Sequence, residues 1–288
     1  MLVDPYHIYN PDDPSISKTG LDQVNKSPAL YYHKTVLGND RSDSRPLIFG
    51  QAFHAAVLEP LVFEDNYAVM PAELAAMDKR RKEGKQALAD WKAEQIGPNG
   101  LAKIVLTKAE GDAIAGMTAG IFANPCARSL IQRAAIVEKA FYHQHEKYEN
   151  VKVRCKPDLI TSDGVVCDLK STAASLVDWH VKAAEPYRYD VQDAFYSDVL
   201  RSCGQEVSDF LFIVVEKTAP YDCAVFGLTD YDRQRAQTEV DVDIAVYSAC
   251  LAAGEWPAAF GGQEKPLRRS LPGWRAERMK RLRTGGEA

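Results

Sequence analysis

The stretch 156–172, "KPDLITSDGVVCDLKST", holds two aspartates ten positions apart, and the second is followed two positions later by a lysine. Side chains two apart on a strand point to the same face of a sheet, so Asp168 and Lys170 share a face. A tight turn at "DG" would pair residue 158 with residue 169, and this places Asp158 within about one rung of Asp168.

Two carboxylates this close repel each other unless a cation lies between them or one of them takes a proton. A hard divalent ion such as Mg²⁺ or Mn²⁺ is the natural cation, because it prefers oxygen ligands. The plainer alternative is a surface ion pair on a charged hairpin. Two other acid-x-lysine triplets, at 83–85 and 90–92, lie in a predicted helix without a partner carboxylate at hairpin distance.

Two further motifs place polar groups one helical turn apart. In "GQAFH", Gly50 and His54 fall on one helix face, and the glycine would let a strand or ligand approach closely. In "QDAFY", Gln192 and Tyr196 have the same spacing on an otherwise apolar helix. Taken alone, each of these motifs is more often structural than functional.

The elements that must position these motifs follow from apolar spacing and from glycine and proline positions. Helices are predicted over 15–33, 45–60, 72–95, 107–133, 176–204 (bent or broken near Pro186) and 230–253, and strands over 135–144, 151–161, 164–172, 208–217 and 222–229. This order indicates an α/β fold in one domain over residues 1–288. Its parts are a mainly helical arm (1–135, carrying His54), an α/β core (136–255) and a basic tail (262–288).

Composition restricts the function classes. A chain of 288 residues that is 46% hydrophobic can build a large core. No segment approaches the roughly 18 apolar residues of a membrane span, and the first residues lack a signal-peptide pattern, so a soluble protein without membrane contact is expected. The six cysteines form no CxxC motif, which favours a reducing cytoplasm over a disulfide framework or a zinc site.

Charge is distributed unevenly along the chain. The formal net charge of −5 would argue against a nucleic-acid partner, but residues 265–286 carry eight Lys/Arg and one acid. A second basic cluster, "KRRKEGK", lies at 79–85. Each cluster alone is equally well explained by a solvated surface. If the tail follows a DNA backbone, its affinity will fall steeply with salt.

The order of the motifs resembles that of the PD-(D/E)XK nuclease superfamily, specifically its RecB-like branch: G-x-x-x-H, then P-D, then D-x-K, then Q-x-x-x-Y. The segments "ISKTGLDQVNKSPALYY", "FGQAFHAAVLEP" and "VQDAFYSDVL" further resemble RecE-type (exonuclease VIII) proteins, whose active-site plan is similar to that of λ exonuclease. The likeness covers about residues 15 to 230. It implies the nuclease core of this superfamily, a mixed central β-sheet flanked by helices, with a helical N-terminal arm.

The resemblance also implies a metal site. Its ligands would be His54, Asp158 and Asp168, with the Leu169 carbonyl as a further candidate. The λ-type relatives carry a glutamate where His54 stands, which leaves the metal preference open between Mg²⁺ and Mn²⁺. Glu138, on the strand before the hairpin, is a candidate of second rank that is more simply read as structural.

Catalytic roles follow from the same resemblance. Lys170 would be the catalytic lysine, and Gln192 and Tyr196 would support the site and contact the DNA strand. Lys170 could orient or deprotonate a metal-bound water and offset charge on the phosphate. A lysine acts as a base only if its pKa is lowered, so activity should rise toward alkaline pH.

The resemblance implies a biological setting as well. This setting is digestion of double-stranded DNA from its 5′ ends, leaving 3′ single-stranded overhangs for phage-type homologous recombination. Its implied partners are a homo-oligomeric ring (trimer or tetramer) and a single-strand annealing protein, in the cytoplasm of a bacterial or phage-infected cell. Candidate phosphate contacts are Lys26, Ser27, Arg45 and Lys156.

Two rival functions stay open. One is an endonuclease or repair nuclease on the same fold, and the other is a catalytically inactive DNA-binding protein. An iron–sulfur cluster is not expected, because no four cysteines bracket the core. ATP is not expected either, because the chain has no GxxxxGK[ST] phosphate loop.

Overall fold

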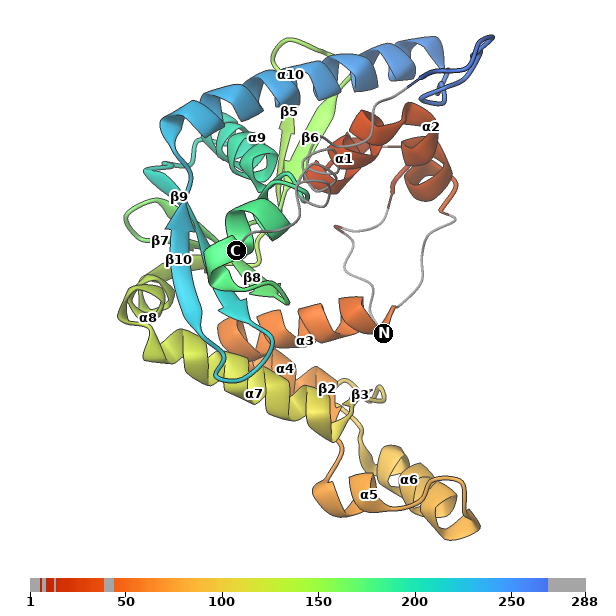
Figure 1. Cartoon of the computed structure of the whole chain (residues 1–288), viewed down its shortest axis with the longest axis vertical. Helices are drawn as coiled ribbons and strands as arrows, with labels where there is room; N and C mark the ends of the chain where they lie inside the picture. The colour runs from red at the N-terminus through yellow and green to blue at the C-terminus, as the bar shows by residue number, and fades with distance from the viewer. Residues whose placement is uncertain (1–5, 7–8, 13, 39–43, 269–288) are drawn as a thin grey trace, which may run out of the picture.

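A mixed five-stranded sheet lies at the centre of the fold (Figure 1), with Asp168 on its strand β8 and Asp158 just before its strand β7. The structure, a computed structural model, describes residues 6, 9–12, 14–38 and 44–268. The strand order is β10-β9-β8-β7-β4, in which β8 and β9 are parallel and all other neighbours antiparallel. The strands are β4 (Ala134–Val137), β7 (Leu159–Thr161), β8 (Val165–Thr172), β9 (Asp209–Glu216) and β10 (Cys223–Gly227). The predicted α/β fold with a mixed sheet is confirmed.

Two smaller sheets complete the β structure. One has the order β1-β6-β5, and the other is the parallel pair β2-β3. Their strands are β1 (Ser15–Ile16), β5 (Phe141–Gln144), β6 (Lys152–Cys155), β2 (Tyr67–Val69) and β3 (Ile104–Leu106). The N-terminal arm is therefore not only helical, because β1 adds a strand beside β6.

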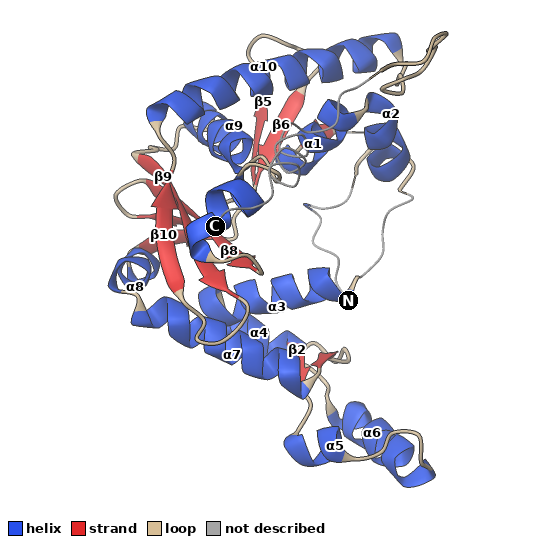
Figure 2. Ribbon diagram, viewed as in Figure 1, coloured by secondary structure: helices blue, strands red, loops and turns tan. Residues whose placement is uncertain are grey.

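Helices account for most of the first half of the chain (Figure 2). The α-helices are α1 (Lys18–Lys26), α2 (Pro28–Tyr31), α3 (Arg45–Leu58), α4 (Pro60–Asn66), α5 (Ala72–Ala76), α6 (Lys82–Glu94), α7 (Lys108–Ala123), α8 (Pro125–Gln132), α9 (Tyr189–Ser202) and α10 (Asp230–Ala253). Shorter helical segments are η2 (Tyr32–Val36), η3 (Leu176–Asp178) and η4 (His180–Ala184).

Several predicted helices are broken in the structure. The one over 107–133 is two helices, because Asn124 ends α7 and its side chain accepts a hydrogen bond from the first turn of α8. The predicted helix over 72–95 is interrupted between α5 and α6. The basic cluster 79–85 therefore spans a turn and a helix start.

Two predicted strands were also wrong in extent. Residues 135–144 and 151–161 are each divided between the five-stranded and the three-stranded sheet. The second break falls at Pro157, which has no N–H to donate to a ladder. The first falls at Glu138, whose φ of 48° lies in the left-handed region that strands do not use. Both breaks lie beside the hairpin aspartates.

The five-stranded sheet has an apolar core on each face. On one face, Val166 and Phe212 pack with α9 and α10. On the other, Cys167 and Leu169 pack with α3 and α7. Alternate residues of β8 point to opposite faces, so Asp168 and Lys170 lie on the side of α9. The sheet thus fixes which helix can reach them.

Helices α5 and α6 form a lobe that projects from the body of the molecule (Figure 2). Most of the predicted basic tail, from residue 269 onward, lies outside the described residues. Among the helices of the described part, none is long and apolar enough to cross a membrane.

Candidate active site

The hairpin brings the two aspartates opposite each other. Strand β7 pairs with β8 through Leu159 with Cys167, and one step further along this ladder Asp158 faces Asp168. The predicted pairing of 158 with 169 was wrong by one residue. The loop has three residues instead of two, with Gly164 at φ 80° closing it, and this arrangement shifts the register.

Both aspartates are buried, with 8% and 3% of Asp158 and Asp168 exposed. The backbone N–H of Leu169 donates to Asp158 Oδ2 at 2.6 Å. The structure therefore brings the Leu169 amide to the site, whereas ligation through its carbonyl stays a prediction. Buried carboxylates need such partners, because an uncompensated charge in the core is costly.

Asp168 is held from both sides. Gln192 of α9 donates to Asp168 Oδ1, and the ammonium group of Lys170 pairs with Asp168 Oδ2. Gln192 is itself 6% exposed, so its amide is committed to this contact. The structure thus brings Gln192 to Asp168, and its role in supporting catalysis stays a prediction.

A second cluster forms around Asp158. His54 Nδ1 lies 3.5 Å from Asp158 Oδ2 and 3.7 Å from Glu138 Oε1. Ligand atoms of these three residues all lie within 4.8 Å of one another. Glu138 arrives there because β4 pairs with β7, and its backbone N–H donates to the Asp158 carbonyl at 3.0 Å.

This donor set could hold a divalent ion. Two carboxylates and one imidazole supply oxygen and nitrogen ligands, and the carboxylates suit Mg²⁺ or Mn²⁺. The grouping differs from the predicted one, because Glu138 takes a place in it while Asp168 is engaged by Lys170 and Gln192. Glu138 was ranked second on sequence grounds, and only the sheet pairing places it beside Asp158.

The cluster shifts the pKa of its members. Burial disfavours the charged form of His54, but the carboxylates of Asp158 and Glu138 outweigh burial and raise the pKa of His54 to about 10. Burial raises the pKa of Asp168 to about 6, against the opposing effect of Lys170. Burial lowers the pKa of Lys170, but Asp168 outweighs it and the net pKa is raised. These neighbours favour an ammonium that offsets phosphate charge over a lysine that abstracts a proton.

Metal binding is expected to strengthen with pH. A ligand must lose its proton before it binds a metal ion, and at pH 7 His54 with a pKa of about 10 carries one. The affinity for Mg²⁺ should therefore rise toward a limit of about tenfold per pH unit between pH 7 and 9, as measured by calorimetry. His54→Gln should remove this slope, and an affinity of the wild type independent of pH would contradict the assignment of His54.

Gly50 leaves room one turn before His54. A methyl group built at Gly50 would meet no atom within 4 Å. Gly50→Ala should therefore stabilise α3 by about 0.5–1 kcal/mol, since alanine favours a helix. If substrate enters this space, the same change should raise KM for DNA several-fold. Thermal melting and steady-state kinetics test the two effects separately, and a stabilised variant with unchanged KM would place the substrate elsewhere.

Tyr196 lies one turn after Gln192 on α9 and is partly buried at the edge of the core. Burial raises its pKa well above the usual value, with the charges of Asp168 and Asp158 adding to the effect. Its ring packs edge-on against Phe210 at 6.3 Å between centroids. Both roles predicted for Tyr196, support of the site and contact with the DNA strand, stay predictions.

The candidate phosphate contacts are scattered. Lys156 pairs with Glu138 Oε2 at 2.8 Å, which places it at the metal cluster. Arg45 binds Glu110 and the Val105 carbonyl at the opposite end of α3 from His54. Lys26 and Ser27 lie at the end of α1. The structure therefore brings only Lys156 to the site.

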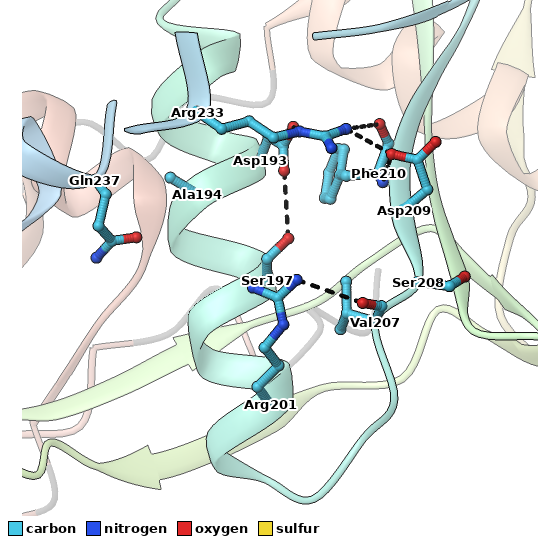
Figure 3. Close-up of a pocket in the computed structure, with 10 residues that line it drawn as sticks. All are labelled: Asp193, Ala194, Ser197, Arg201, Val207, Ser208, Asp209, Phe210, Arg233 and Gln237. Carbon is cyan, nitrogen blue, oxygen red and sulfur yellow. Dashed lines mark hydrogen bonds and ion pairs between the residues drawn. The ribbon is translucent and has the colours of Figure 1, made fainter. Parts of the chain in front are cut away.

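A separate pocket lies on another face of α9 (Figure 3). Arg233 spans it and donates to Asp193 at 2.8 Å and to Asp209 at 2.6 Å. These contacts compensate the charges within the pocket. None of the predicted site residues lines it.

Comparisons with known proteins agree with this architecture. A proposed exonuclease from Eubacterium rectale superposes with a TM-score of 0.55 at 13% identity, covering 91% of this chain and 92% of that one. An alkaline exonuclease from Laribacter hongkongensis gives a TM-score of 0.31 at 15% identity, covering 70% and 95%, too low a score to carry an argument. Among curated proteins, none matches this sequence.

The first likeness shows the fold alone, because the identity is low. A family model described as "PDDEXK-like domain of unknown function (DUF3799)" matches residues 17–265. This match spans the arm, the hairpin and α9, and it confirms the predicted PD-(D/E)XK superfamily and its fold. The chain therefore belongs to the PDDEXK-like domain family of unknown function.

Proposed function

We propose that this chain is a metal-dependent exodeoxyribonuclease that hydrolyses the phosphodiester bonds of double-stranded DNA. One observation carries the proposal: the buried carboxylates of Asp158, just before β7, and Asp168, on β8, come together where these strands pair, with the ammonium of Lys170 beside them. A structural ion pair would not require a second buried carboxylate. A hydrolase that uses divalent ions on a phosphodiester needs such a cluster to hold them.

The residues divide the work of hydrolysis. His54, Glu138 and Asp158 would hold a divalent ion, with Asp168 adjoining them. Such an ion supplies a water of lowered pKa and positive charge for the phosphate oxygens. Lys170 adds a positive charge at the same place, and Gln192 holds Asp168 so that Lys170 stays oriented. Burial of the aspartates excludes bulk water and strengthens these interactions.

The finer parts of the proposal rest on the resemblance to RecE-type proteins. They are digestion from the 5′ end, Mg²⁺ as the ion with Mn²⁺ as a substitute, and 3′ overhangs that enter phage-type recombination in the cytoplasm. A ring of three or four subunits and a single-strand annealing protein would be its partners. A closed ring is the simplest way for a single domain to stay on a duplex during processive digestion.

The deciding experiment is digestion of a linear duplex labelled separately at its 5′ and 3′ ends. It is run with Mg²⁺ or with EDTA, by the wild type and by Lys170→Ala, beside a covalently closed circle. Release of 5′-terminal nucleotides that requires Mg²⁺ and Lys170, with the circle intact, supports the proposal.

Other outcomes of the same digestion experiment would favour one of the two alternative functions. Cutting of the circle would make the protein an endonuclease or repair nuclease. Release from the 3′ end would remove the stated polarity but keep the nuclease. If no metal supports cutting while the duplex is bound, the chain is a DNA-binding protein on a nuclease fold.

A further inference from the structure

The segment 176–188, between β8 and α9, exposes apolar side chains beside the candidate site. Val177, Val181 and Tyr187 are 82%, 61% and 61% exposed, and Val177 is the most exposed large apolar residue of the described chain. The segment follows the strand that carries Lys170 and precedes the helix that carries Gln192. Single exposed apolar side chains are common on protein surfaces, so the link between this segment and Lys170 is what gives its exposure a meaning.

An aromatic stack joins this surface to Lys170. The ring of Tyr187 is stacked on that of Tyr189 with centroids 5.8 Å apart and an angle of 26° between planes. Lys170 Nζ lies 4.7 Å from the centroid of Tyr189. Tyr189 in turn stacks on the buried Trp179 at 5.7 Å. Tyr187 is the exposed end of a stack that begins in the core and passes the catalytic lysine.

The backbone under Tyr187 is held firmly. Lys18, itself only 9% exposed, donates to the Tyr187 carbonyl at 2.5 Å. Arg188, between the two tyrosines, has a φ of 51° and is anchored to Asp22 and Asp243 at 3.1 and 2.7 Å. A non-glycine residue in the left-handed region persists only where its surroundings hold it there. The backbone that carries Tyr187 is thus fixed in position before any ligand binds.

We propose that the ring of Tyr187 is a stacking platform for a nucleobase of the DNA strand that is being cut. The proposal rests on the nuclease function proposed above and adds a substrate contact to it. Aromatic rings bind bases of any sequence by stacking, because every base has a π-face. One face of Tyr187 is covered by Tyr189, and its exposure leaves the remainder of the ring open. The contact supplies positioning without sequence preference, which suits an enzyme that digests any end.

The test compares Tyr187→Ala, Tyr187→Phe and wild type on duplex ends with normal or abasic terminal nucleotides. Tyr187→Ala should raise KM by roughly tenfold on normal ends with little change in kcat, and Tyr187→Phe should behave as wild type. On abasic ends the wild type should show the KM that Tyr187→Ala shows on normal ends. The KM of Tyr187→Ala should be the same on abasic and on normal ends. Tyr231→Ala, which removes a tyrosine 75% exposed at the start of α10, is the matched control.

A binding experiment separates this inference from the nuclease proposal. Ends carrying 2-aminopurine are mixed with protein in Ca²⁺, and quenching of the probe is compared between wild type and Tyr187→Ala. If the wild type binds these ends but does not cut them when Mg²⁺ or Mn²⁺ replaces Ca²⁺, the nuclease proposal fails while quenching still decides the platform. The proposed stacking role of Tyr187 would be overturned if quenching and KM were equal in wild type and Tyr187→Ala. It would also be overturned if the alanine variant changed its oligomeric mass. Absence of binding by the wild type would overturn both proposals.

Discussion

Lys170→Met is expected to lower metal-dependent DNA hydrolysis by about 10³-fold. The ammonium of Lys170 pairs with Asp168 and lies over Tyr189, so it stands where phosphate charge would develop. Methionine keeps the length and apolar volume of the stem but removes the charge. The variant should therefore lose its rate constant and not its fold, as single-turnover digestion and circular dichroism would show.

The thermal stability of Lys170→Met tests the same role of Lys170 independently of its activity. Removing Lys170 leaves Asp168 buried without its cation, and breaking a buried pair in this way costs several kcal/mol. A bound divalent ion would restore positive charge beside Asp168. The Tm of Lys170→Met should thus fall in EDTA and rise more with Mg²⁺ than the Tm of wild type does. Lys108→Ala, which removes an exposed lysine paired with Asp112 on α7, is the control and should change neither rate nor Tm gain. Digestion by Lys170→Met within threefold of wild type would refute the role of Lys170.

The sequence predicted the central pair of the site because local rules determine it. Asp158 and Asp168 come together through one hairpin, and the spacing of Gln192 on α9 brings its amide toward the same face. The register was off by one residue, because a three-residue loop and a two-residue turn have similar sequences. Gly164 is compatible with both, and only the observed pairing of Leu159 with Cys167 decides between them.

Nonlocal contacts were beyond sequence reasoning. Glu138 reaches the cluster because β4 pairs with β7, and its left-handed backbone turns it out of the strand. An acid at the end of a short strand was a visible signal, but nothing in the sequence said which strand would be its neighbour. The aromatic contacts that link Tyr187 to Lys170 could not be predicted from the sequence either, because they too depend on how separate segments pack together. They depend on the irregular segment 176–188, where the sequence predicted a helix over 176–204 with a bend or break only near Pro186.

Glu138→Gln is the second change for which a large effect is expected. Glu138 Oε1 lies 3.7 Å from His54 Nδ1, and the glutamine keeps the size of the side chain while removing its charge. A metal site that loses one of two carboxylates binds the ion much more weakly, because hard cations depend on charged oxygen ligands. We expect Kd for Mg²⁺ to rise about 100-fold and activity at low Mg²⁺ to fall in proportion, as calorimetry and a metal titration of digestion would measure.

The metal titration distinguishes ligation from a structural role. If Glu138 is a ligand, high Mg²⁺ should recover much of the activity of Glu138→Gln, and the Tm in EDTA should stay near that of wild type. If Glu138 only anchors Lys156, to which it is bonded at 2.8 Å, added Mg²⁺ would recover nothing. Glu59→Gln is the matched control, because Glu59 lies close enough for Glu138 to contribute to raising its pKa but lies outside the ligand cluster. An unchanged Mg²⁺ affinity in Glu138→Gln would return the ligand set to His54, Asp158 and Asp168, and Lys170 would then have to release Asp168 when the ion binds.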